Sequence, residues 1–217
     1  MRWEQIGAVS VLTDTNCTIQ TDALLLARFA TPHAAERVCD LGTGCGTMPA
    51  VWLNDAGFYG TVTGVERNEQ AVAICSKTIE KNRLSSRFTL LKQDWNDLTD
   101  RTFDRVVCNP PYFAVGTGAT NLDRLRNEAR HEKEDHPLEA VLEVAARLLQ
   151  TGGRFDLCHK PERLCEVLEK MRRVGIEPKR LQMVQHTPDT PAWLFLCEGR
   201  RNAHPGLTVL PTLINGV

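Results

Sequence analysis

The alternation of strand-like and helix-like segments is the feature that most limits what this chain can fold into. Short apolar runs that are typical of strands lie at 37–41, 61–65, 87–92, 103–108 and 154–158. Segments with helical spacing separate them. In one of these, Val72, Cys75 and Ile79 step by three and four residues. Strands that alternate with crossover helices form a mostly parallel, doubly wound sheet.

Capping residues and glycines mark where these helices begin and end. We expect helices over 23–29, 47–55, 68–82 and 138–149, and a further helix that opens at Pro161. Asn68 is a suitable cap for the third of them. Gly152 and Gly153 follow the leucine-rich stripe of the fourth and are expected to end it.

The last two strand candidates, 180–185 and 192–197, break the parallel pattern. Only a short connection that contains prolines and Asp189 lies between them, and it is too short for a crossover helix. We therefore expect these two strands to pair antiparallel. The predicted fold class is α/β, with a Rossmann-like, mostly parallel, seven-stranded sheet and an antiparallel C-terminal pair.

Composition excludes several other classes of protein. The chain has 217 residues, of which 42% are apolar, and a net charge of −1. These values suit one domain over 1–217 and argue against a disordered chain. No apolar run reaches the roughly 18 residues that span a membrane, and the first residues lack a signal-peptide pattern. We expect a cytoplasmic protein without membrane partners, and a monomer is favoured.

The eight cysteines give no sign of a metal site or a disulfide framework. They include no CxxC pair, and no Cys/His spacing matches a zinc finger. Cys39 and Cys108 lie inside apolar runs, where a thiol behaves as a small hydrophobic side chain. We expect reduced structural thiols and no bound metal.

A glycine-rich turn follows the first strand of the alternating pattern. Its sequence is Asp-Leu-Gly-Thr-Gly-Cys-Gly over 40–46, and a helix is expected after it. Glycines at this place allow a tight turn and a close approach of the backbone to a ligand. Glu66 ends the next strand, 20 residues after Gly46, where a carboxylate can accept hydrogen bonds from ribose hydroxyls. A bound nucleoside is therefore expected, from either a dinucleotide or S-adenosylmethionine (SAM).

Two observations favour SAM over a dinucleotide. Asp40 precedes the turn, where a carboxylate would attract a cationic amino-acid group and repel a pyrophosphate. Thr47 stands where the dinucleotide fingerprint needs its third glycine. Asp94 and Trp95 end the third strand, and Asp94 is suited to accept from the amine of an adenine. The expected cofactor-binding residues of this part of the chain are Asp40, Gly42, Thr43, Gly44, Gly46, Glu66, Asp94 and Trp95. The alternative is that the three acids are ordinary solvated loop residues.

The tetrapeptide Asn109-Pro110-Pro111-Tyr112 comes directly after the fourth strand. Its two prolines stiffen the turn and remove two backbone donors. The Asn109 side-chain oxygen and the Pro110 carbonyl can then accept hydrogen bonds from an amino group whose lone pair is delocalised. Accepting both hydrogens favours a pyramidal nitrogen aimed at a methyl donor, which is preorganisation without a strong base. The alternative is a structural turn with a packed tyrosine.

Tyr112 and Phe113 supply aromatic faces for a flat substrate. We therefore assign Asn109, Pro110, Pro111 and Tyr112 as catalytic residues. Asn109 is also placed among the cofactor-binding residues, and Tyr112 and Phe113 among the substrate-binding residues. The charged segment that follows, 113–136, shows no regular pattern, and long irregular segments are often functional.

With these motifs in hand, the sequence resembles class I SAM-dependent methyltransferases whose NPPY-type motif marks transfer to an exocyclic or amide nitrogen. It is most similar to the bacterial tRNA adenine-N6 methyltransferases that modify the adenine 3′ of the valine anticodon. The similar segments are 20–27, 40–46 with Pro49, 109–113, 129–132, 177–181 and 206–211. The tail stops soon after Pro211, which departs from relatives with a longer C-terminus.

The resemblance implies further roles. SAM is implied as the cofactor and tRNA as the partner, with a flipped adenine beside Asn109. Asp22 is implied to lie near the amino-acid end of the cofactor, although it would also serve as an N-cap. Residues 1–36 are expected to pack on the cofactor side as an N-terminal extension. Arg130 and His131 are expected at the substrate pocket. The sequence itself also predicts a basic cluster that contacts phosphates, formed by Lys170, Arg172, Arg173, Lys179, Arg180, Arg200 and Arg201.

Other functions remain open at this point. A protein glutamine-amide N-methyltransferase would use the same motif, but such enzymes resemble one another in a sizeable N-terminal helical domain, and only 36 residues precede the first strand here. Methylation of a DNA adenine or an RNA guanine is also chemically open. A nucleotide-binding protein without turnover is a third class, which the intact Asn109 and Tyr112 disfavour.

Overall fold

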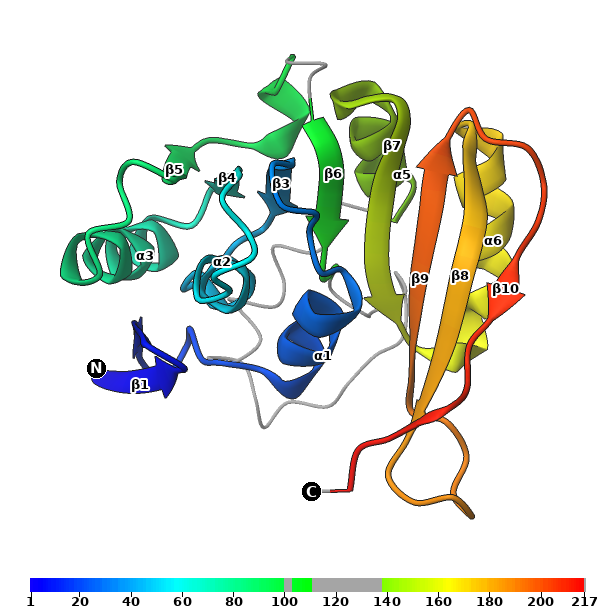
Figure 1. Cartoon of the computed structure of the whole chain (residues 1–217), viewed down its shortest axis with the longest axis horizontal. Coiled ribbons are helices and arrows are strands. Elements are labelled where there is room, and N and C mark those ends of the chain that lie inside the picture. Colours follow the sequence, from blue (N-terminus) through cyan, green and yellow to red (C-terminus); the bar gives the residue numbers. More distant parts are fainter. Residues whose placement is uncertain (100–102, 111–137, 217) are drawn as a thin grey trace, which may run out of the picture.

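The computed structural model describes residues 1–99, 103–110 and 138–216. Nine strands of this part form one central sheet in the order β10-β8-β9-β7-β6-β3-β4-β5, with β11 also on β8 (Figure 1). The long strands are β3 (Arg37–Leu41), β4 (Thr61–Glu66), β5 (Phe88–Lys92), β6 (Phe103–Cys108), β7 (Leu149–His159), β8 (Ile176–Gln185) and β9 (Leu194–Arg201). β10 (Thr208–Val209) and β11 (Leu213–Ile214) are two residues each.

The strand directions confirm the predicted fold class. β5, β4, β3, β6 and β7 pair in parallel. β9 runs antiparallel to both β7 and β8, so the predicted C-terminal pair is present. The seven long strands are the predicted sheet, and β10 and β11 extend it in parallel with β8.

The helices match the predicted segments with shifted ends. They are α1 (Thr21–Phe29), α2 (Thr47–Leu53), α3 (Glu69–Lys81), α5 (Leu138–Leu148) and α6 (Leu164–Arg173), with short 3₁₀ turns η1 (Trp95–Asp97) and η3 (Pro161–Arg163). Asn68 caps α3 as expected, since its side chain accepts from the Ala71 amide at 3.0 Å. The expected end of α5 at Gly152-Gly153 is wrong, because β7 already begins at Leu149.

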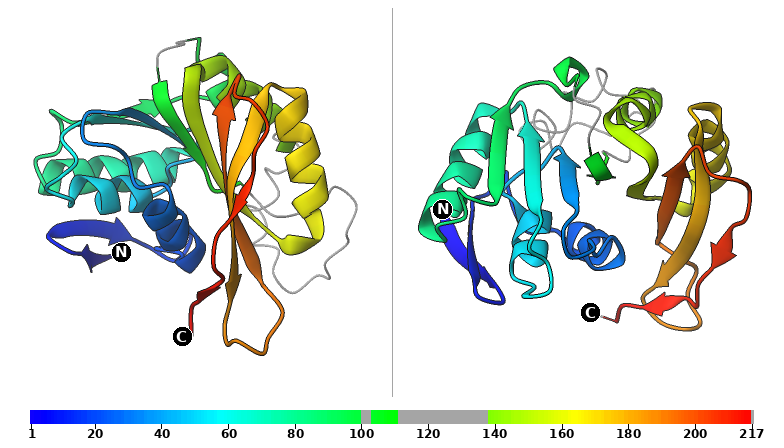
Figure 2. Two further views of the ribbon diagram at one scale, coloured as in Figure 1. Left: turned by 45° about the vertical axis from the view of Figure 1, so that its right-hand side comes forward. Right: turned by 45° about the horizontal axis from the view of Figure 1, so that its top comes forward.

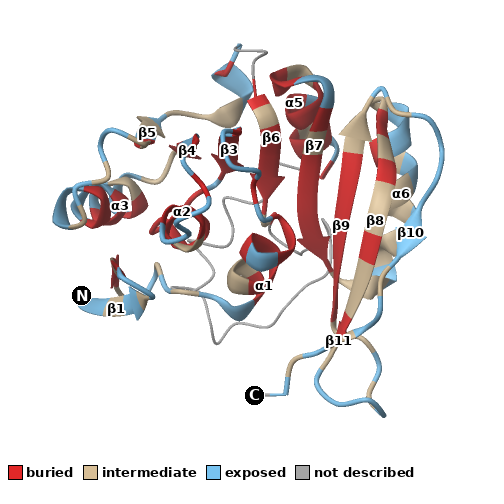
Figure 3. Cartoon of the chain, in the orientation of Figure 1, coloured by how far each residue is buried: buried red, intermediate tan, exposed pale blue. Residues whose placement is uncertain are grey.

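Two apolar cores lie on opposite faces of the sheet, because side chains alternate along each strand. Val106 and Cys108 belong to the core that α5 and α6 cover. Val107 and Cys158 belong to the core that α1, α2 and α3 cover. Figure 2 shows the two groups of helices on either side of the sheet, and Figure 3 shows the central strands as its most buried part.

An N-terminal hairpin, which the sequence reasoning missed, packs beside α2 and α3. β1 (Arg2–Ile6) and β2 (Val9–Thr13) pair antiparallel across a turn that begins with Gly7, whose φ is +57°. The hairpin is joined to α3 by its backbone, since the Leu12 amide donates to the Thr78 hydroxyl at 3.0 Å. This contact fixes the start of the chain against the helix that follows β4.

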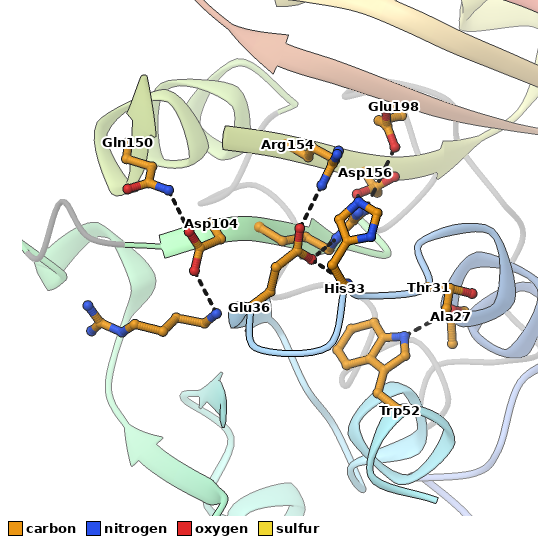
Figure 4. Close-up of polar contacts among 12 residues, drawn as sticks. Ala27, Thr31, His33, Glu36, Trp52, Asp104, Gln150, Arg154, Asp156 and Glu198 are labelled. Carbon is orange, nitrogen blue, oxygen red and sulfur yellow. Dashed lines mark hydrogen bonds and ion pairs between the residues drawn. The ribbon is translucent and has the colours of Figure 1, made fainter. Parts of the chain in front are cut away.

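A buried ion cluster joins the middle of the sheet to the loop before β3. Arg105 on β6 donates to Glu36 at 3.0 Å and also to Asp156, and it lies 3.8 Å from Glu198. Arg154 reaches Glu36 at 2.6 Å. Figure 4 shows Glu36, Arg154, Asp156 and Glu198 gathered around this point. The Arg105 side chain is 2% exposed and faces three acids. Its positive charge therefore compensates their buried negative charge.

Three further observations concern the described part of the chain. The eight cysteines, all of which lie in this part, are free thiols. No group of three metal-ligating side chains comes together among these residues. None of their helices combines the length and the apolar character needed to cross a bilayer.

Candidate functional site

The register of the sheet brings the glycine turn and Asn109 to one edge. Leu41 on β3 pairs with Cys108 on β6, so the residues that follow, Gly42 and Asn109, leave neighbouring strands at the same level. Leu41 also pairs with Val65, which places Glu66 on the other side of the turn. Ligands of open α/β sheets bind at this carboxyl edge.

The glycine turn has the backbone shape that its sequence predicts. Gly42, Gly44 and Gly46 have φ of +75°, +57° and +86°, a region that L side chains rarely adopt. A Cβ on Gly42 would lie 3.3 Å from the Trp95 ring, so Trp95 packs beside the turn. The turn therefore presents bare backbone at the edge of the sheet.

Asp40 is the most buried acid of this edge. Its side chain is fully buried, and the Thr43 hydroxyl donates to its Oδ2 at 2.7 Å. Its Oδ1 has no hydrogen-bond partner among the described residues. Burial is the main cause that raises the pKa of Asp40 to about 7. A buried acceptor oxygen that has no hydrogen-bond partner is suited to a cationic ligand.

Glu66 holds the turn and the start of α3 together. Its Oε2 accepts from the Gly44 amide at 3.0 Å, and its Oε1 accepts from the Asn68 amide at 2.9 Å. Each carboxylate oxygen keeps a second acceptor direction. The side chain is therefore fixed in place and still able to accept from hydroxyl groups of a ligand.

Asp94 lies at the end of the neighbouring strand β5. It caps η1 by accepting from the Asn96 amide at 2.8 Å, and its Oδ2 lies 3.7 Å from Arg67. Lys92 pairs with Glu66 across the two strands, so Asp94 comes just beyond Glu66 on the same edge. The sheet thus brings together the three acids that the sequence places around the cofactor.

Asn109 and Pro110 are the described part of the NPPY motif. Asn109 is half-buried and Pro110 is buried. The Cys158 thiol on β7 donates to Asn109 Oδ1, with Sγ and Oδ1 3.1 Å apart. Other predicted site residues lie outside the described residues and stay predictions: Pro111, Tyr112, Phe113, Arg130 and His131.

Asp22 lies in the first turn of α1 and does not cap it. Gln20 holds the N-cap position and Thr21 begins the helix, so the expectation of Asp22 as a cap is wrong. Its Oδ1 accepts from the adjacent Ala23 amide at 2.8 Å. α1 packs against α2, the helix that follows the glycine turn. A place near the cofactor stays a prediction for Asp22.

The predicted basic cluster is largely paired with acids. Arg180 contacts Glu198 at 2.9 Å and lies over the Phe29 ring. Arg200 is level with Arg105, which is four residues or about 13 Å before Asn109 along the strand direction. Lys170, Arg172 and Arg173 each pair with glutamates.

Lys179 differs from the rest of the basic cluster. It sits at an irregularity between Pro178 and Arg180, where the pairing of β8 with β9 shifts by one residue. Its Nζ donates to the His204 carbonyl at 3.0 Å, and no acid is its partner in that contact. The charge of Lys179 is therefore more available to a phosphate than the charge of Arg180.

Several residues of this edge escaped the sequence reasoning. Cys158 and His159 end β7 beside Asn109, and neither belongs to a recognisable motif. Burial is the main cause that lowers the pKa of His159 to about 4. In the β8–β9 connection, Trp193 stacks on His186 at 5.2 Å, and Lys160 lies 5.2 Å from the same ring. The pairing of β7 with β6 brings Cys158 beside Asn109, and the pairing of β8 with β9 brings Trp193 beside His186.

The edge fits SAM in chemistry. The unpartnered, buried Asp40 oxygen suits the ammonium group of an amino-acid tail. Glu66 suits ribose hydroxyls, and Asp94 suits an adenine amine. The bare glycine turn gives backbone access between these acids. A pyrophosphate in the same place would meet the carboxylate of Asp40.

Comparison with known proteins agrees with this fit. Residues 16–174 match the family described as "Methyltransferase small domain". A solved structure from Agrobacterium tumefaciens, described as a predicted O-methyltransferase, has a TM-score of 0.69 at 23% identity and covers 89% of this chain and 87% of that chain. At this identity the likeness shows the fold, which is that of the class I SAM-dependent methyltransferases.

Two relatives carry the name tRNA1(Val) (adenine(37)-N6)-methyltransferase. The one from Shewanella woodyi is 31% identical over 164 residues, which are 71% of this chain and 65% of that protein, just under two thirds of its length. The one from Shewanella baltica is 30% identical over 194 residues, which are 80% of this chain and 79% of that protein. The chain therefore belongs to the methyltransferase small domain family, with these bacterial enzymes among its relatives.

Proposed function

We propose that this protein transfers a methyl group from SAM to the exocyclic N6 of an adenine in tRNA, the one next to the anticodon. The observation that carries the proposal is the place of Asn109 beside Gly42, at the edge where Asp40, Glu66 and Asp94 also lie. The names of the relatives from Shewanella support tRNA as the substrate.

The chain's own residues account for cofactor binding. SAM, when bound, supplies a methyl group on a positively charged sulfur. Asp40 pairs with the ammonium of its amino-acid end, Glu66 accepts from the ribose hydroxyls, and Asp94 accepts from the adenine amine. Thr43 keeps the Asp40 carboxylate in place through its 2.7 Å hydrogen bond.

Asn109 and Pro110 prepare the acceptor nitrogen. The N6 lone pair of adenine is delocalised into the ring, so the nitrogen is a weak nucleophile. Asn109 Oδ1 and the Pro110 carbonyl accept its two hydrogens, which favours a pyramidal nitrogen and directs the lone pair at the methyl group. The proton then leaves to solvent after transfer. Tyr112 and Phe113 stack on the extruded base.

The proposal also includes the remaining expectations from the sequence. The whole chain acts as one methyltransferase domain with residues 1–36 on its cofactor side, as a monomer in the cytoplasm. α1 belongs to this segment and packs against α2, which supports that placement. Light scattering after size exclusion, with and without tRNA, tests the oligomeric state.

The direct test is methyl transfer to a defined RNA. An unmodified transcript of a valine tRNA is incubated with the protein and SAM that carries an isotopically labelled methyl group. Nucleoside mass spectrometry is expected to find the label in N6-methyladenosine. A transcript with guanosine in place of the target adenosine is the control and is expected to stay unlabelled. Label found only in protein, or only on guanine, would overturn the proposal.

A further inference from the structure

Cys158 makes a contact with the proposed catalytic asparagine that no motif predicts. Leu157 on β7 pairs with Cys108 on β6, so Cys158 and Asn109 follow at the same level of adjacent strands. The Cys158 side chain is fully buried, and its Sγ lies 3.1 Å from Asn109 Oδ1. Because an amide oxygen only accepts, the thiol is the donor of this hydrogen bond.

The chemistry of the two groups decides which way the Asn109 carboxamide is turned. A carboxamide has one acceptor end and one donor end of nearly equal size, and a rotation by half a turn exchanges them. A thiol is a weak donor and a weak acceptor, and here it donates, so the contact favours the orientation that turns Oδ1 toward Cys158. A carboxamide oxygen has two lone pairs, so a donor on one of them does not by itself exclude an amino group from the other.

The rest of the environment leaves Cys158 little freedom. It belongs to the apolar core formed with α1 and α2, together with Val107, Val184 and Leu196. A side chain packed in this way keeps its thiol at one place beside Asn109. The contact is therefore a fixed part of the carboxyl edge.

We propose that Cys158 is a positioning residue for Asn109. Its thiol holds the carboxamide with Oδ1 oriented as an acceptor, so that the substrate amino group meets oxygen and not the amide NH₂. This inference rests on the proposed methyl transfer and adds a residue to it. Cys158 itself touches neither the cofactor nor the transferred methyl group in this role.

The kinetic test compares substitutions that keep or remove the donor. Cys158→Ala is expected to lower kcat about three- to tenfold, the scale of one modest hydrogen bond, while KM for tRNA and the affinity for SAM stay near wild type. Cys158→Ser keeps a hydroxyl donor and is expected to restore most of kcat. Cys197→Ala removes another fully buried thiol, on β9, and is the matched control with unchanged kcat.

A double-mutant cycle separates positioning from packing. In an Asn109→Ala background, removal of the Cys158 thiol is expected to cause no further loss of kcat, because the group that it orients is gone. A packing defect would lower kcat by the same factor in both backgrounds. Equal kcat for wild type, Cys158→Ala and Cys158→Ser would overturn the inference.

Infrared spectroscopy tests the contact without any turnover. The S–H stretching band of Cys158 is identified as the band lost in Cys158→Ser, and it is expected to shift in Asn109→Ala. An unshifted band would overturn the contact and with it the inference. If the wild-type protein methylates no tRNA but the band still shifts in Asn109→Ala, the proposed function is overturned and the contact between the two side chains is established.

Discussion

The Thr43 hydroxyl donates to one oxygen of Asp40 at 2.7 Å, while the other oxygen of this carboxylate is buried without a hydrogen-bond partner in the described residues. Burial disfavours the charged form and is the first cause of the raised pKa, about 7. The free protein therefore carries a carboxyl group that gains a full charge only above neutral pH. This state has consequences for stability and for cofactor binding.

Asp40 is expected to make the free protein less stable as pH rises. Its folded-state pKa lies above the usual 3.8, so the folded state binds more protons than the unfolded state between about pH 4 and pH 7. The contribution to stability is present below this range and is lost as pH rises through it. Asp40→Asn is expected to remove that part of the pH dependence, as measured by urea unfolding at pH 5 and pH 8. An unchanged pH profile in the variant would contradict the assignment.

SAM binding is expected to show the opposite pH dependence. A cationic ammonium group favours ionised Asp40, so affinity should increase from pH 6 to pH 8, and binding at pH 6.5 should release protons. Calorimetry in two buffers of different ionisation enthalpy measures that release. Asp40→Asn is expected to bind SAM weakly and with little pH dependence. A wild-type affinity for SAM in this variant would argue against a contact with the cofactor.

Removal of the Asn109 side chain is expected to affect turnover far more than binding. Asn109→Ala should lower kcat by about two to three orders of magnitude, which is the scale of losing one preorganised polar group. Its affinity for SAM should stay near wild type. Single-turnover methyl transfer and calorimetry measure the two quantities. A nearly unchanged kcat would refute the assigned role.

Loss of Arg105 is expected to destabilise the fold strongly. Arg105→Ala would leave Glu36, Asp156 and Glu198 without the guanidinium that they share. Breaking a buried ion pair on one side costs about 3–5 kcal/mol of unfolding free energy. Arg173→Ala is the matched control, since Arg173 and Glu169 are both 64% exposed and their pair is worth about 0.5 kcal/mol. Urea unfolding of both variants checks the contrast, and equal losses would contradict it.

Lys179 and Arg180 are expected to differ in their effect on RNA binding. Lys179→Ala should weaken tRNA binding and reduce the slope of log K against log salt by about one, because one phosphate contact is lost. Arg180→Ala should mainly lower stability, because Arg180 pairs with the buried Glu198. Filter binding at several salt concentrations and urea unfolding separate the two effects. An unchanged salt slope in Lys179→Ala would place the RNA elsewhere.

The order of strands and helices could be predicted because the local patterns agree with the sheet. Val72, Cys75 and Ile79 give α3 its period, and Asn68 gives its start. The ends of the elements were harder to predict where a helical pattern and a strand pattern overlap. Leu149 continues the leucine stripe of α5, yet its backbone pairs with Phe103, so sheet pairing overrode helical spacing. The hairpin β1–β2 was missed because the apolar residues of β1, Trp3 and Ile6, are three positions apart and do not show the alternation of a strand.

The shared place of the three acids at the carboxyl edge was easier to predict than the contacts across the sheet. Asp40, Glu66 and Asp94 lie at or just beyond the carboxyl ends of strands, so the rule that these strand ends meet at one edge brings them together. Cys158 is 49 residues from Asn109, and nothing near either residue indicates the other. Such a contact depends on register, which only the three-dimensional structure supplies.

The pairing of Leu41 with Cys108 also limits how this enzyme family can change. Because side chains alternate across a sheet, an insertion or deletion of one residue within β6 would send Asn109 to the face covered by α5 and α6, away from Cys158. Evolution can therefore lengthen or replace the connections beyond the carboxyl edge, and so change the acceptor molecule, while the number of residues in β6 stays fixed.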